Sequence, residues 1–78
     1  MKPYVGMIVT YHPAQKALVD GRRLEDSPAI VTRVLPSGLI NATVFMDSGR
    51  TFAVWDLPPA EGAAGKAHWL PVKEWADG

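Results

Sequence analysis

Apolar and polar positions alternate in short runs along most of this chain, and turn-forming residues close each run. The runs cover residues 5–12, 28–36, 39–47, 51–57 and 66–72. Short runs rich in β-branched and aromatic residues, bounded by Gly, Pro, Ser and Asp, are typical of β-strands joined by tight turns. The pattern therefore predicts an all-β domain, a small five-stranded antiparallel barrel.

The same alternation predicts which side chains form the core, because successive residues of a strand point to opposite faces. The predicted inward residues are Val5, Met7, Val9 and Tyr11 in the first run, Ile40, Ala42, Val44 and Met46 in the third, and Ala53, Trp55 and Leu57 in the fourth. Phe45 is then placed on the outer face. The second run is apolar on both faces, which indicates either a strand covered on both sides or a bulge that changes the phase.

A long segment, residues 14–27, separates the first two strands and carries a turn signal at Asp20-Gly21. We expect a long loop or an irregular hairpin folded over one mouth of the barrel, and a short helix over residues 14–19 is the alternative. Residues 73–78 are expected to form a short turn or a frayed end. Together these segments predict a single domain over residues 1–78.

Composition narrows the possible partners. The chain has 78 residues, eight basic and eight acidic side chains, and no cysteine. Zero net charge gives no general attraction to nucleic acid, and the lack of cysteine excludes Cys-ligated zinc. We find no signal-peptide pattern and no run near the ~20 apolar residues that a membrane helix needs, so we expect a soluble, cytoplasmic protein without membrane association.

Side chains capable of catalysis are few and scattered. His12 and His68 have no spacing typical of a metal motif, and we interpret them as structural polar residues. The serines all lie in predicted turns, without the strand–turn–helix context of a nucleophile. The sequence therefore predicts no enzyme, no metal and no cofactor.

A candidate ligand site combines arginines of the predicted loops and turns with aromatic residues in the second half of the chain. Its members are Arg22, Arg23, Phe45, Arg50, His68 and Trp69. Aromatic rings stack on nucleobases, and guanidinium groups bind phosphate in a fork. The alternative is that Trp55 and Trp69 fill the core and that Arg22 and Arg23 belong to a solvated loop.

The order of one strand, a long loop, three meandering strands and a short closing strand resembles an SH3-like barrel. The stretches VGMIVTYH, SPAIVTRV, INATVFMDSG and GKAHWLP also resemble a group of small uncharacterised proteins of tailed phages and prophages. The chain departs from that group at residues 65–71, where one tryptophan of the group's pattern is missing and Leu70 precedes the proline.

This resemblance implies a phage-encoded protein that acts in the host cytoplasm or in the virion. One hypothesis is a non-catalytic binding module that sequesters a small nucleotide-like signalling molecule of host immunity, an anti-defence function. The alternative is a protein-interaction module or a structural or decoration component of the virion, with a host or virion protein as partner. A thin core and half-apolar strands favour a homo-oligomer in either case.

Overall fold

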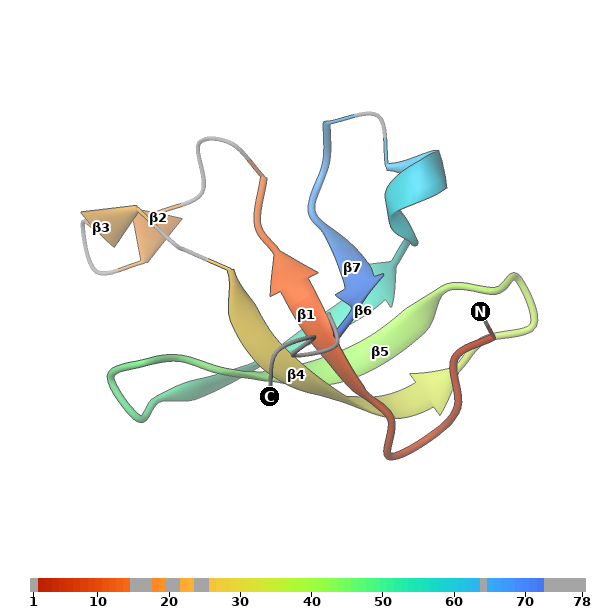
Figure 1. Ribbon diagram of the computed structural model, residues 1–78, viewed down its shortest axis with the longest axis horizontal. Helices are drawn as coiled ribbons and strands as arrows, with labels where there is room; N and C mark the ends of the chain where they lie inside the picture. Colours follow the sequence, from red (N-terminus) through yellow and green to blue (C-terminus); the bar gives the residue numbers. More distant parts are fainter. Residues whose placement is uncertain (1, 15–17, 20–21, 24–25, 64, 73–78) are drawn as a thin grey trace, which may run out of the picture.

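The computed structural model describes residues 2–14, 18–19, 22–23, 26–63 and 65–72. Its main sheet contains β1 (Ile8–His12), β4 (Ser27–Val34), β5 (Ile40–Phe45), β6 (Thr51–Leu57) and β7 (His68–Pro71). The strand order is β6-β5-β4-β1-β7, and all neighbours are antiparallel (Figure 1). The all-β prediction is thus confirmed with five strands. No ladder between β6 and β7 closes the sheet among the described residues.

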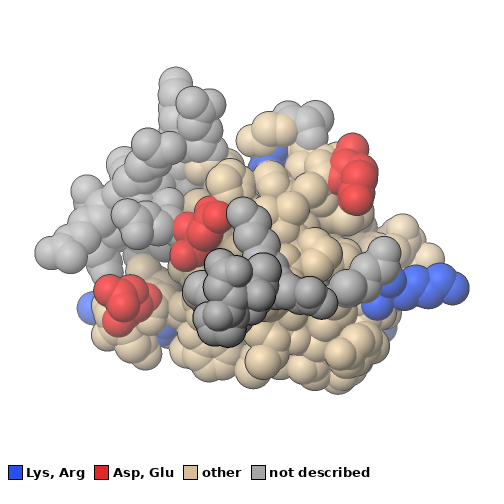
Figure 2. Space-filling model, in the orientation of Figure 1, with Lys and Arg blue, Asp and Glu red and all other residues tan. Residues whose placement is uncertain are grey.

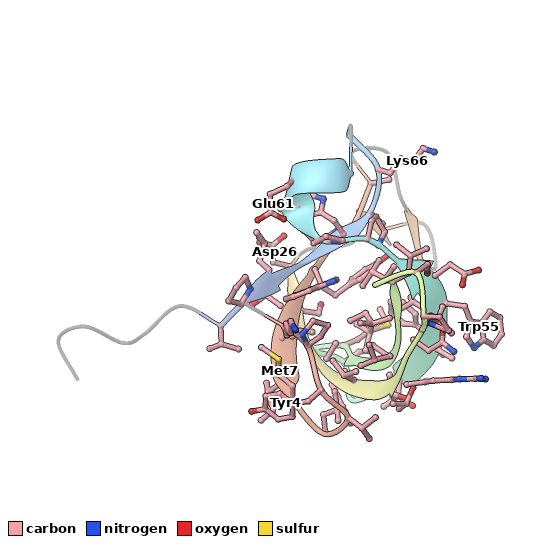
Figure 3. The ribbon with its side chains drawn as sticks, turned by 90° about the vertical axis from the view of Figure 1, so that its right-hand side faces the viewer. Tyr4, Met7, Asp26, Trp55, Glu61 and Lys66 are labelled. Atoms are coloured by element: carbon pink, nitrogen blue, oxygen red, sulfur yellow. The ribbon has the colours of Figure 1, made fainter. Side chains whose placement is uncertain are left out.

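The sheet nevertheless curls strongly, so that strands far apart in its order come into contact. Tyr11 of β1 and Phe52 of β6 make an edge-to-face contact with ring centroids 5.7 Å apart. The two edges also approach at one point, where the amide of Trp69 donates a hydrogen bond of 3.0 Å to the carbonyl of Pro58. Figure 3 looks into this curl and shows side chains filling its centre.

The core lies on the inner face of the curled sheet. Its buried members are Met7, Val9, Tyr11, Ala29, Val31, Ile40, Ala42, Val44, Leu57 and Trp69. The predicted inward faces of β1 and β5 are therefore confirmed, with two exceptions. Val5 is exposed because it lies in a turn before β1, beside Gly6 with its φ of 91°. Met46, which follows the end of β5, is only half-buried.

The prediction for β6 was wrong at two of its three inward positions. Trp55 is 71% exposed and Ala53 is also exposed, whereas Phe52 and Val54 pack against the core. The cause is a register shift, because Ile40 of β5 pairs with Leu57 while Ala42 pairs with Val54. The extra residue in β6 reverses the alternation, and only Leu57 points inward as predicted.

The bulge in β6 is centred on Asp56. Its φ is 55°, in the left-handed region. Its backbone N–H donates a hydrogen bond of 3.2 Å to Oδ1 of Asn41 on the neighbouring strand β5. The side chain of Asn41 thereby satisfies a backbone donor at the irregular point of the ladder.

A second bulge explains the two-sided pattern of β4. The register shifts between Val31 and Arg33, which confirms the bulge interpretation for this run. Before the shift, Ser27, Ala29 and Val31 are buried. After it, Val34 pairs with the buried Ile40, so the phase has changed.

Two turns of the main sheet share one geometry. In the turn between β4 and β5, Gly38 has a φ of 92° and donates its N–H to the carbonyl of Leu35. In the turn between β5 and β6, Gly49 has a φ of 90° and donates in the same way to Met46. Three-residue loops that end in a glycine with a positive φ are common in β-hairpins, and both turns have this form.

The long segment after β1 contains a small hairpin in which β2 (Leu18–Val19) pairs with β3 (Arg22–Arg23). A hairpin was one of the predicted forms, and the strand at Leu18–Val19 contradicts the alternative helix over 14–19. Figure 1 places this hairpin to one side of the main sheet. The Asp20-Gly21 turn signal and residues 73–78 lie outside the described residues.

One short helical turn, η1 (Ala60–Gly62), connects β6 to β7. In the part of the chain that the structure describes, no helix is long and apolar enough to cross a membrane.

Candidate functional site

The structure brings most strand ends that carry the predicted site residues to one end of the sheet. Phe45 is the last residue of β5 and pairs with Thr51, which follows Arg50. His68 is the first residue of β7. In the sheet order, β4 and β1 lie between β5 and β7, so Phe45 and His68 are on strands that share no ladder.

The two predicted arginines of the long segment form β3. Their backbone pairs with β2, with Leu18 opposite Arg23 and Val19 opposite Arg22. Their side chains lie outside what the structure describes. Their contribution to a phosphate site therefore stays a prediction.

Trp69 lies in the core and is only 4% exposed. No described residue accepts a hydrogen bond from its buried Nε1. Its ring cannot act as a stacking platform for a ligand, which corrects its place among the predicted site residues. The alternative, in which Trp69 fills the core, describes it correctly, whereas the exposed tryptophan is Trp55.

The outer face of the sheet forms a surface that the sequence did not reveal. Cross-strand pairs connect Ile8 to Ile30, Ile30 to Thr43, and Thr43 to Ala53, so one row crosses four strands. Phe45 and Trp55 lie on the same face, on either side of this row. We call Ile8, Ile30, Phe45, Ala53 and Trp55 the outer apolar face.

This face carries unusually little charge. Its polar members among the described strands are mostly neutral, such as Thr10, Asn41, Thr43 and Thr51, and the exposed Asp56 follows Trp55 at the bulge of β6. Arg33, beside the bulge of β4, lies at its margin opposite Asn41. Figure 2 views the molecule from the side opposite Trp55; on that side Asp and Glu side chains form separate groups and Lys and Arg side chains lie toward the edges. The solvent-exposed face of an antiparallel sheet normally consists mostly of polar residues. Exposed apolar residues on such a face mark it as a candidate interaction surface.

A compact polar cluster lies at one end of the same side of the sheet. His12 of β1 and His68 of β7 are cross-strand partners, and their ring centroids are 4.8 Å apart with planes inclined by 34°. Nδ1 of His12 lies 2.6 Å from Oδ1 of Asp26. Nδ1 of His68 lies 2.8 Å from the carbonyl oxygen of Lys66. The sequence shows both histidines, but the long segment between them hides the register that pairs them.

Burial perturbs one titratable group of the core. Desolvation raises the pKa of the Tyr11 phenol above its usual value of 10.0, because burial penalises the charged phenolate. The phenol is therefore neutral at physiological pH and acts as a packing group. Among the described residues, no group of three or more His, Asp or Glu side chains is arranged to hold a metal ion.

Comparisons with known proteins add no assignment. No family model, no curated protein and no solved structure matches this chain. The resemblance to small phage proteins therefore stays a prediction.

Proposed function

We propose that this chain is a non-catalytic protein-interaction module that binds through the outer apolar face of an SH3-like barrel. The observation that carries the proposal is a row of apolar and neutral side chains across four strands, with Trp55 71% exposed beside it. Depletion of charge around exposed aromatic residues is the composition that distinguishes the centre of protein–protein interfaces.

The order of elements supports the SH3-like assignment. One strand is followed by an excursion that contains a small hairpin, then by three meandering strands, a helical turn and a short closing strand. The contact between Tyr11 and Phe52 brings the inner faces of β1 and β6 together, as in a barrel with a filled centre. In so small a barrel the interior is occupied by side chains, which leaves the outside for recognition.

The exposed apolar area is spread around the curl of the sheet. Ile8 is 58% exposed, Ile30 37% and Phe45 38%, in addition to Trp55. With about 150–250 Å² for a whole aromatic side chain, these residues expose apolar area on the order of 400 Å². Because β1 and β6 lie on opposite sides of the curl, a single flat partner covers only part of this area. A standard interface buries about 800 Å² per partner, of which little more than half is apolar. An exposed tryptophan at such a surface is a typical hot spot.

A second copy of the chain is the occupant that this face fits best. In a two-fold symmetric contact each face meets an identical face, so any charge near its centre meets the same charge. The outer apolar face avoids this repulsion because its central row holds Ile8, Ile30, Thr43 and Ala53. The threonine can donate and accept hydrogen bonds across the contact.

Sedimentation equilibrium of the untagged protein over a wide concentration range tests the proposal. We expect reversible dimers, and we expect Trp55→Ala to weaken the dimer at least tenfold. Tyr4→Ala is the matched control, because Tyr4 is 63% exposed but lies away from Trp55 (Figure 3). A monomer at every concentration, or equal weakening by both variants, would contradict the proposal.

One observation keeps nucleotide binding as a second candidate. Phe45, the last residue of β5, and Arg50, which precedes β6, flank the same turn, and an aromatic ring and a guanidinium are the groups that bind a base and its phosphate. A thermal-shift panel of cyclic nucleotides and ADP-ribose derivatives tests it. A ligand at a thousandfold excess over its Kd stabilises by about 4 kcal/mol, and Phe45→Ala should remove that shift. No shift with any compound would leave the protein-interaction module as the sole candidate.

A further inference from the structure

The paired histidines at the end of β1 and β7 form a cluster that the interaction surface does not use. His12 and His68 lie directly opposite each other. Their strands β1 and β7 are antiparallel neighbours, and Figure 1 shows them side by side. The His12 side chain is 46% exposed and His68 is half-buried, so both rings are held by the sheet yet reach solvent.

The hydrogen bonds of the two rings fix the position of their protons. Nδ1 of His12 faces a carboxylate oxygen of Asp26, and Nδ1 of His68 faces the backbone carbonyl of Lys66. Both partners are acceptors, so each Nδ1 carries a hydrogen and donates it. In the neutral rings the lone pair then lies on Nε2 of both histidines. Metal-binding histidines show this arrangement, with one nitrogen donating to a carboxylate or carbonyl and the other free to ligate.

The spacing of the rings also suits a shared ion. Two imidazoles bound through Nε2 at about 2.0–2.1 Å, with an angle of about 90–109° at the metal, have ring centroids roughly 4.5–5.2 Å apart. The observed separation is 4.8 Å. We propose that His12 and His68 form a two-histidine site for a divalent transition-metal ion, with both Nε2 atoms as ligands and Asp26 as the group that orients His12.

Such a site holds its ion weakly, because the protein supplies two ligands and water fills the remaining positions. Imidazole nitrogen prefers Zn²⁺, Ni²⁺ and Cu²⁺ to Mg²⁺ or Ca²⁺, and the affinity follows the order Ni²⁺ < Cu²⁺ > Zn²⁺. A bound ion connects β1 to the short strand β7 and therefore stabilises the fold as well. The inference is independent of the proposed interaction surface.

Titration of the untagged protein with Zn²⁺ tests the site, because a histidine tag would compete for the ion. Long-range ¹H–¹⁵N correlation spectra report the tautomer of each ring directly. We expect a proton on Nδ1 of both rings before titration and a shift of both Nε2 resonances as Zn²⁺ binds. Spectra of the unsubstituted protein with no Nε2 shift at millimolar Zn²⁺ would overturn the proposal.

Variants assign the ligands by calorimetry. His12→Asn and His68→Asn should each abolish Zn²⁺ binding, and Asp26→Asn should weaken it about 10-fold to 100-fold by releasing His12. Asp47→Asn is the control, since it removes a carboxylate from the distant turn after β5 and should leave the affinity unchanged. Equal affinity in either histidine variant, or equal weakening by Asp26→Asn and Asp47→Asn, would count against the site.

Discussion

Tyr11 lies where the inner faces of distant strands meet, and its side chain both packs and titrates. Its ring makes the edge-to-face contact with Phe52 that joins β1 to β6 across the curl. The same burial raises the pKa of its phenol above 10.0. The fold therefore favours the neutral form, whereas the phenol of the unfolded chain ionises at its ordinary pKa.

Replacement of Tyr11 by Phe should make the protein less sensitive to alkali. Below pH 10 the phenol is neutral in both states, so its contribution to the free energy of unfolding is constant. Above that pH the unfolded state releases the proton first and stability falls as the pH rises through the folded pKa. Urea titrations at several pH values should show a steeper alkaline decrease in the wild type than in Tyr11→Phe. Tyr4→Phe, at an exposed tyrosine, should keep the wild-type slope, and identical slopes in all three proteins would contradict the argument.

At the level of elements, regular strands were predictable and bulges were not. The core face of β5 follows directly from Ile40, Ala42 and Val44, because alternation is unbroken there. In β6 the same rule placed Trp55 in the core, since no local pattern signals the extra residue. A left-handed φ at a bulge usually indicates glycine, but here Asp56 adopts it.

The candidate site was only partly predictable from the sequence, because it also depends on strand register. The sequence shows every histidine, arginine and aromatic residue, but register decides which of them meet. The long segment between β1 and β4 and the loop before β7 can close in many ways. Pairing of His12 with His68 and exposure of Trp55 were therefore out of reach, although Phe45 was placed correctly on the outer face.

Substitutions at Asp56 test how much its positive φ at the bulge in β6 lowers the free energy of unfolding. Glycine takes a positive φ without steric penalty, so Asp56→Gly should raise the free energy of unfolding by up to about 1 kcal/mol. A β-branched side chain is poorly tolerated there, and Asp56→Val should lower it by roughly 1–2 kcal/mol. The measurement is urea unfolding followed by circular dichroism.

Asp47 provides the comparison for these substitutions, because it is an exposed aspartate in a turn without a positive φ. Asp47→Gly should not stabilise the protein, since the added glycine only increases the freedom of the unfolded chain. If glycine had the same effect at both positions, backbone strain at Asp56 would not be the cause.

At the level of the whole molecule, Trp69 holds the two edges of the open sheet together. Its edge strands β6 and β7 share no ladder among the described residues, yet the chain after β6 contacts β7 through the hydrogen bond from Trp69 to Pro58. The indole of Trp69 belongs to the same core as residues of β1, β4 and β5. Trp69 therefore couples the closing strand to the rest of the protein.

Truncation of Trp69 should destabilise the whole domain rather than release β7 alone. Removal of a buried aromatic side chain costs about 3–5 kcal/mol, while a domain of this size has a total stability of about 4–12 kcal/mol. In Trp69→Ala, hydrogen exchange should accelerate at amides of β4 and β5 as much as in β7, because the sheet shares one core. Tyr4→Ala, which changes an exposed aromatic residue outside the outer apolar face, should shift the free energy of unfolding by no more than about 0.5 kcal/mol. Faster exchange confined to β7 in Trp69→Ala would instead show that β1, β4, β5 and β6 fold without the closing strand.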